Sequence, residues 1–217
     1  MDRRLLGWVA VVSTLLTALG LAGADRPLAE WVHASGIEQA RAFSLGLGAL
    51  DVATGVHIWY WLAGSVVLTV GIVACAVRRD LRWPRMLVAA GCVQFACIGT
   101  MILGKTWFGR LRPQQVFESG DWAHVWFAGG GSFPSGHSAF YFGLLLPLAA
   151  ACPARWQRLA VLAIPLYVVL ARIDLAKHFL SDVAASALLA AVYALILATL
   201  IRRWLPPPSP QPALSAA

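Results

Sequence analysis

Long apolar stretches separated by short polar segments dominate the chain. A helix that crosses the hydrocarbon core of a membrane, about 30 Å thick, needs about 20 mostly apolar residues. The apolar stretches reach or approach that length, so the sequence predicts an all-α fold, a bundle of six transmembrane helices in a single domain, residues 1–217. The expected spans are residues 5–24, 57–77, 86–104, 133–152, 159–176 and 179–201.

The composition points to the same environment. Apolar residues make up 59% of the 217 positions and charged residues only 12%, whereas a soluble domain carries about 25% charged residues. The charge content is too low for a water-exposed surface, and the apolar content excludes a disordered chain. We therefore expect an integral membrane protein.

Arginines set the expected orientation. If six helices alternate, one side of the membrane receives Arg3, Arg4, Arg78, Arg79, Arg82, Arg85, Arg155, Arg158, Arg202 and Arg203. The positive-inside rule makes that side cytoplasmic and places both termini there. Ala22-Gly23-Ala24 after the first run resembles a signal-peptide cleavage site, but the run is longer than a usual signal core, which favours an uncleaved first helix.

Two polar segments are not expected to cross the membrane. In residues 25–56, Leu28, Trp31 and Val32 are spaced for one helical face, which predicts an interfacial segment on the outer surface. This segment either covers a site and admits a lipid or is a packed connector, and the sequence does not separate the two. The proline-rich residues 205–217 are expected to form a flexible cytoplasmic tail.

Polar residues from three distant segments meet on the outer side of the predicted bundle. The third span ends near Lys105, the fourth begins near residues 135–137, and the last two meet between Arg172 and His178. Charged residues at membrane depth are costly, so they are functional candidates. Arginine forks match phosphate oxygens, and the basic candidates are Lys105, Arg110, Arg112 and Arg172.

The remaining polar residues fit the handling of an anion. A glycine run, residues 129–131, is expected to be flexible and precedes Pro134-Ser135-Gly136-His137 at a helix start, where free N–H groups attract anions. Asp182 lies four residues after His178, on the same helix face, and Asp174 competes as a partner at the same spacing. Several fixed cations argue against a metal site, so we expect no metal and no cofactor.

Three motifs carry a resemblance to a known family. They are Lys105 followed after six residues by Arg112-Pro113, then Pro134-Ser135-Gly136-His137, and then Arg172, His178 and Asp182 at intervals of five and three residues. In this order and spacing they resemble the type 2 phosphatidic acid phosphatases, the membrane branch of the superfamily that includes vanadium haloperoxidases. Ala171 stands where that family often has serine, which removes one hydrogen bond from the site.

The resemblance implies a mechanism and a role for each residue. His178 attacks phosphorus to form a phosphohistidine, Asp182 orients its ring, and His137 is the general acid and later the base. The phosphate would be held by Lys105, Arg112, Arg172 and the N–H groups of Ser135 and Gly136. Arg110 remains open between substrate contact and lipid-headgroup contact, and Asp174 is expected to pair with a nearby arginine.

The expected function is a metal-independent phosphatase for a lipid phosphate or diphosphate, such as undecaprenyl diphosphate or phosphatidylglycerophosphate. Alternatives are a phosphatidic acid or lipid A phosphatase, a lipid phosphotransferase with the same site, and a non-catalytic phospholipid transporter or binding protein. The expected partners are the lipid substrate and the bilayer, without nucleic acid and with no protein partner evident. Arginine-rich composition suggests a bacterium, with the protein in its inner membrane and the site on the periplasmic face.

Overall fold

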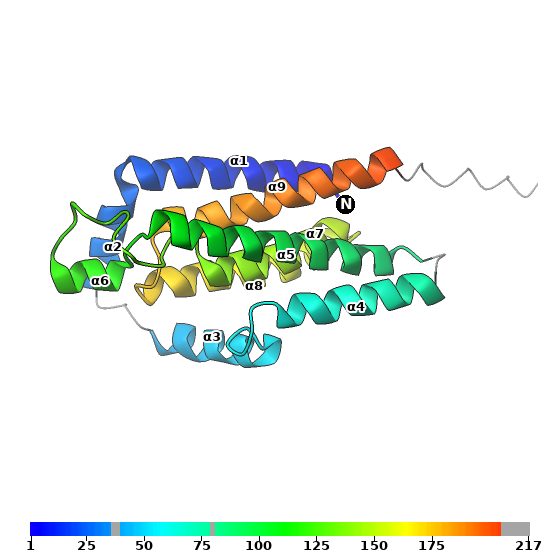
Figure 1. The fold of residues 1–217 in the computed structure, drawn as a ribbon, viewed down its shortest axis with the longest axis horizontal. Coiled ribbons are helices and arrows are strands. Elements are labelled where there is room, and N and C mark those ends of the chain that lie inside the picture. The colour runs from blue at the N-terminus through cyan, green and yellow to red at the C-terminus, as the bar shows by residue number, and fades with distance from the viewer. Residues whose placement is uncertain (36–39, 79–80, 205–217) are drawn as a thin grey trace, which may run out of the picture.

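The computed structural model describes residues 1–35, 40–78 and 81–204, with side chains up to residue 200. Every regular element in these ranges is helical (Figure 1). The elements are α1 (Arg3–Leu19), η1 (Gly20–Ala24), α2 (Asp25–Ala34), α3 (Arg41–Thr54), α4 (Leu62–Val77), α5 (Trp83–Phe108), α6 (Pro113–Ser119), α7 (Gly136–Ala151), α8 (Arg155–Asp174) and α9 (Leu180–Trp204). The predicted tail at 205–217 and Arg79 lie outside the described residues.

The all-α prediction is confirmed, and several helices are suited to a membrane. Four helical stretches are long and apolar enough to cross one: Arg3–Ala34, Trp83–Ser119, Arg155–Asp174 and Leu180–Leu200. The other two predicted spans correspond to α4 and α7, apolar helices of 16 residues each. At about 1.5 Å per residue, such helices fall short of a full hydrocarbon core, so the count of six spans and the topology stay predictions.

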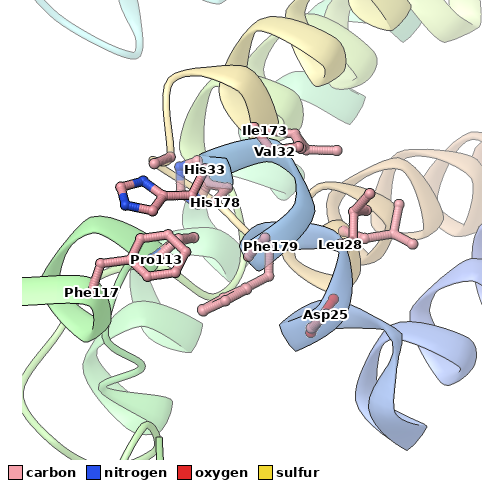
Figure 2. A pocket seen from close by; sticks show the side chains of 12 residues that line it. Asp25, Leu28, Val32, His33, Pro113, Phe117, Ile173, His178 and Phe179 are labelled. Atoms are coloured by element: carbon pink, nitrogen blue, oxygen red, sulfur yellow. The ribbon is translucent and has the colours of Figure 1, made fainter. Parts of the chain in front are cut away.

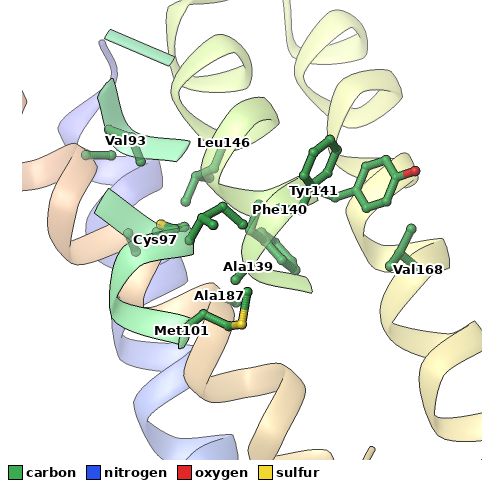
Figure 3. Close-up of a cluster of buried hydrophobic side chains, with 14 of the residues drawn as sticks. Val93, Cys97, Met101, Ala139, Phe140, Tyr141, Leu146, Val168 and Ala187 are labelled. Carbon is green, nitrogen blue, oxygen red and sulfur yellow. The ribbon is translucent and has the colours of Figure 1, made fainter. Parts of the chain in front are cut away.

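The core forms around α7, which packs against α5, α8 and α9. Its Phe140 and Leu146 are fully buried, together with Cys97 of α5 and Val168 of α8 (Figure 3). Helix α9 contributes small residues to the same core, namely Ala187, Ala190, Ala191 and Ala194. Small side chains let helix backbones approach closely, which is the main source of helix association in a lipid environment.

The N-terminal helix changes direction before it reaches the site. Helix α1 packs along α9 and continues through η1, where Gly23 has a φ of 143°, into α2. The interfacial segment is therefore helical over residues 25–34, as its spacing indicated. The face differs from the prediction, since Val32 is buried while Trp31 is 61% exposed. Helices α2 and α6 lie at one end of the bundle, and α3 lies near that end beside α8 (Figure 1).

Replacing Phe140 tests the packing around α7. Phe140→Ala leaves a cavity of about 100 Å³, which at about 24 cal/mol per Å³ costs roughly 2 kcal/mol of unfolding free energy. This cost comes from lost packing rather than from transfer of the ring to water, because lipid surrounds the ring with apolar groups even when the helices are apart. Thermal unfolding in detergent measures the effect. The matched control Leu103→Ala, at a position 72% exposed, should change the midpoint little, and an equal effect at both positions would refute this core.

Candidate active site

The loop after α5 and the glycine-rich loop before α7 are joined by backbone hydrogen bonds, and together they form one side of the site. The segment after α5 accepts backbone hydrogen bonds at Gly109 O from Gly130 N (2.9 Å) and at Arg110 O from Ser132 N (2.9 Å). A Cβ on Gly130 would overlap the Arg110 carbonyl, so this position needs glycine for close backbone approach. The glycine run expected to be flexible is thus tied by hydrogen bonds. These hydrogen bonds also fix the direction in which the Ser132 side chain points.

His178 and Asp182 meet at the start of α9, where a one-turn spacing brings their side chains together. The His178 ring Nδ1 lies 3.6 Å from the Asp182 carboxylate and 3.5 Å from the Ser132 hydroxyl. Ser132 donates its single proton to Asp182 at 2.6 Å, so its oxygen faces His178 as an acceptor. Both neighbours of Nδ1 are acceptors, which assigns the proton to Nδ1 and leaves a lone pair on Nε2.

His178 is a neutral histidine in a dry environment. Only 2% of the residue is exposed, and burial is the main reason that the pKa of His178 falls to about 3. The nearby Arg172 lowers this pKa further, whereas Asp182 raises it. Below its usual pKa a free histidine would be charged, but here the neutral ring persists to acidic pH. A neutral ring with a free Nε2 is the nucleophilic form of histidine.

Arg110 is the partner of the catalytic carboxylate candidate. Its guanidinium donates to Asp182 at 2.5 Å and to Asp25, the first residue of α2, at 2.7 Å. It is also stacked between the rings of Trp126 and Phe179, at 4.4 and 4.1 Å from their centroids. The sequence left Arg110 open between substrate and headgroup contact. In the structure its charge is compensated inside the protein by Asp25 and Asp182.

Asp25 and Ser181 complete this buried network. Asp25 accepts hydrogen bonds from the Ser181 hydroxyl (2.5 Å) and the Ser181 backbone N–H (2.9 Å). The link ties the start of α2 to the start of α9. Neither residue was singled out by sequence, and the only signal was that Asp25 is the first charge after a long apolar run.

The side of His178 that faces α2 is closed. A cavity of about 10 Å³ lies there, lined by Val32, His33, Phe117 and His178 among others (Figure 2). The His33 ring stacks on Phe117 with centroids 4.4 Å apart. This volume holds no more than a single water molecule. A phosphate group does not fit into this cavity.

Three cations, Lys105, Arg112 and Arg172, lie close to one another near the two histidines. Arg172 acts electrostatically on Lys105, His137 and His178, and Arg112 acts on Lys105 and Arg172. Lys105 donates to Gly131 O at 2.7 Å. Arg172 is 9% exposed, and its Nε has no hydrogen-bond partner among the described residues. A buried guanidinium without a carboxylate is costly, and an anionic ligand would offset that cost.

The start of α7 differs in part from the prediction. Ser135 caps the helix by accepting a bond from Ser138 N at 3.4 Å, but its own N–H donates to Asp182 O at 3.1 Å. The Ser135 N–H is thus occupied and cannot bind phosphate while that bond holds. The sequence did not predict this bond, because its acceptor lies on α9, distant in sequence. Gly136 follows at the first helical position, and a Cβ there would lie 3.1 Å from the Tyr60 hydroxyl.

His137 contacts an acid that sequence reasoning missed. Its Nε2 lies 3.1 Å from the Asp51 carboxylate of α3, and its Nδ1 lies 3.5 Å from the Tyr60 hydroxyl. The Tyr141 hydroxyl donates to the other Asp51 oxygen at 3.3 Å. No motif marked Asp51, since it lies in the segment read as a surface connector. The contact arises from the way α3 packs beside α8.

Asp174 acts away from His178. Its carboxylate accepts a hydrogen bond at 3.0 Å from the backbone N–H of Ala40, just before α3. Asp182, rather than Asp174, is therefore the acid beside His178. Asp174 instead helps to hold α3 against α8.

The donor set is that of an oxyanion site at the end of a helical membrane bundle. Among the described residues, no group of three or more His, Cys, Asp or Glu side chains is placed to hold a metal ion. Residues 84–206 match the PAP2 superfamily, more than half of the chain. The chain belongs to the PAP2 superfamily and is a phosphatase-type membrane protein. No curated protein and no solved structure matches it.

Two arginines separate structural charge from ligand-binding charge. Arg110→Met leaves Asp25 and Asp182 buried without their cation, and such a loss costs about 3–5 kcal/mol of stability. Arg172→Met removes a buried charge that forms no ion pair with a carboxylate among the described residues and feels Asp51 only at a distance, so stability should hold or rise. Thermal unfolding in detergent with and without inorganic vanadate, a phosphate analogue, measures both effects. Vanadate should stabilise the wild type through binding but not Arg172→Met, and the opposite ranking of stabilities would contradict this assignment.

Proposed function

We propose that the protein hydrolyses a lipid phosphate or diphosphate without a metal ion, through a phosphohistidine on His178. The single observation that carries the proposal is the buried Arg172 guanidinium, whose Nε lacks a partner among the described residues, within electrostatic range of the neutral His178. Binding of an anionic phosphate would neutralise that charge and place phosphorus beside a nucleophile. Membership of the PAP2 superfamily independently suggests phosphatase activity.

The proposed reaction has two chemical steps. The Nε2 lone pair of His178 attacks phosphorus, and the bond to the leaving oxygen breaks as that oxygen takes a proton from His137. Lys105, Arg112 and Arg172 stabilise charge on the equatorial oxygens. Water then attacks phosphorus, the P–N bond breaks, and His137 takes the proton of the water. Asp182 stabilises the positive charge that His178 gains in the first step.

The substrate class follows from the position of the site in the bundle. The site lies at the end of the bundle where α5 ends, while the helix starts with Arg82, Arg85, Arg155 and Arg158 lie at the other end (Figure 1). The positive-inside rule would make the arginine end cytoplasmic and the site end periplasmic or external. A lipid could then keep its tails in the outer leaflet. Undecaprenyl diphosphate, phosphatidylglycerophosphate, phosphatidic acid and lipid A phosphates all fit this description.

Two other functions compete with hydrolysis. A phosphotransferase would use the same residues, with a lipid hydroxyl or phosphate in place of water, so an acceptor lipid is needed to distinguish it. A non-catalytic lipid-binding or transport protein would need the cations. It would not need a neutral histidine with its Nδ1 facing Asp182 and Ser132, and this arrangement favours the enzyme.

The proposed function is tested by phosphate release from lipid phosphates in detergent, with EDTA present. Wild type should release phosphate and accumulate an acid-labile phosphoprotein on rapid quenching. His178→Ala should lose both, by at least 10⁴-fold in rate if nucleophilic catalysis is removed. The matched control is His124→Ala, an exposed histidine paired with Asp121 outside the site, which should retain full activity. Release that EDTA abolishes, or that survives His178→Ala, would refute the mechanism.

A further inference from the structure

We propose that Asp51 is the positioning residue of His137, an inference that rests on the proposed phosphatase function. Asp51 belongs to α3, outside every motif that defines the site, yet its carboxylate lies 3.1 Å from Nε2 of His137. The side chains of the two residues are 16% and 18% exposed. At this burial a carboxylate acts on an imidazole with less screening than at a free surface.

The contact determines which nitrogen of His137 carries the mobile proton. A carboxylate at Nε2 only accepts, so the Nε2 proton stays between His137 and Asp51. The proton given to the leaving oxygen therefore comes from Nδ1, the nitrogen that lies 3.5 Å from the Tyr60 hydroxyl. After the transfer His137 is neutral, with its lone pair on Nδ1. The same atom then takes the proton from the attacking water.

Asp51 also offsets the charges that oppose protonation of His137. Arg172 of α8 and Lys105 of α5 act on the ring as like charges, and Tyr60 contacts it as a neutral group. Asp51 is the carboxylate within reach on the described chain. A general acid must hold a proton before it can donate one, so a negative partner is needed beside these cations. The bound phosphate supplies further negative charge only while substrate is present.

The surroundings of Asp51 hold it in place for this role. Tyr141 donates to its second oxygen at 3.3 Å, and α3 is fixed by two contacts to α8. Tyr167 donates to Ala42 O at 2.6 Å, and Asp174 accepts from Ala40 N at 3.0 Å. Asp51 thus sits on a helix anchored at its start and supported by the core residue Tyr141. Asp182 is held in the same way beside His178, by hydrogen bonds from Ser132 and Arg110.

Leaving-group dependence tests whether Asp51 acts through proton donation. Dodecyl phosphate expels an alkoxide and needs a general acid, whereas a dodecyl-substituted nitrophenyl phosphate expels a stabilised phenolate and needs little help. For Asp51→Asn, kcat/KM on dodecyl phosphate should fall by about 100–1000-fold, within the range attributed to general acid catalysis. The fall on the nitrophenyl ester should be less than about tenfold, since kcat/KM reports the first irreversible step. Asp51→Glu, which keeps the charge, should recover part of the lost alkyl phosphate activity.

The controls separate this inference from the proposed function. Asp121→Asn removes another carboxylate that contacts a histidine, at 2.8 Å and exposed, and should leave both rates unchanged. Equal losses on both esters for Asp51→Asn would show a structural role only and overturn the inference. A third outcome is that wild type cleaves both esters and His137→Ala loses the same factor of kcat/KM on each. His137 would then not be the acid, and the inference would fall while the phosphatase function stands. No cleavage of either ester by wild type would overturn both.

Discussion

The site depends on one buried carboxylate, that of Asp182, which is fully buried at the start of α9. Its oxygens accept from Arg110, Ser132 and the Phe179 N–H, and its main-chain oxygen accepts from Ser135 N. An isolated charge at this depth would be prohibitive. The donors that make it tolerable come from the loop after α5, the glycine-rich loop and the segment before α9, so stabilising one charge brings these three segments together around His178. The main-chain bond from Ser135 adds the start of α7.

The need to compensate a buried charge also accounts for the difference between Arg110 and Arg172. Arg110 is compensated by Asp25 and Asp182 and is stacked between aromatic rings, which gives it a fixed position and no spare charge. Arg172 is nearly as buried, and its Nε, like that of Arg110, has no hydrogen-bond partner among the residues described. Arg172 differs in having no ion pair with a carboxylate among those residues, so its positive charge is left without one beside His178, the proposed nucleophile. An anion that binds beside Arg172 would compensate this charge, and that compensation contributes to the binding free energy.

Sequence reasoning reached the residues whose spacing carries information and missed those placed by tertiary packing. Helical periodicity joined His178 to Asp182, and the ends of apolar runs brought Lys105 and Arg172 to one end of the bundle. Asp51 lies on α3, in a segment predicted only as an interfacial segment or connector, and Ser132 lies in a loop, so only the packed structure shows their contacts. The hydrogen bond from Ser135 N–H, which was predicted to contact phosphate, was missed for the same reason, because its acceptor lies on α9. Helices α4 and α7 are shorter than the spans predicted for them, since apolar residues continue into the segments that precede each helix and hydropathy does not mark where the helix begins.

The two histidines are held by opposite nitrogens, and this follows from what each must do. His178 contacts Asp182 through Nδ1 and His137 contacts Asp51 through Nε2. In the proposed mechanism this leaves Nε2 of His178 for phosphorus and Nδ1 of His137 for the proton. An in-line displacement needs the nucleophile and the leaving oxygen on opposite sides of phosphorus, so the two rings have to converge from different elements. The nucleophile's partner is deeply buried, which suits a ring that must stay neutral. The acid's partner lies on α3, nearer the surface, where His137 can exchange its proton with water between turnovers.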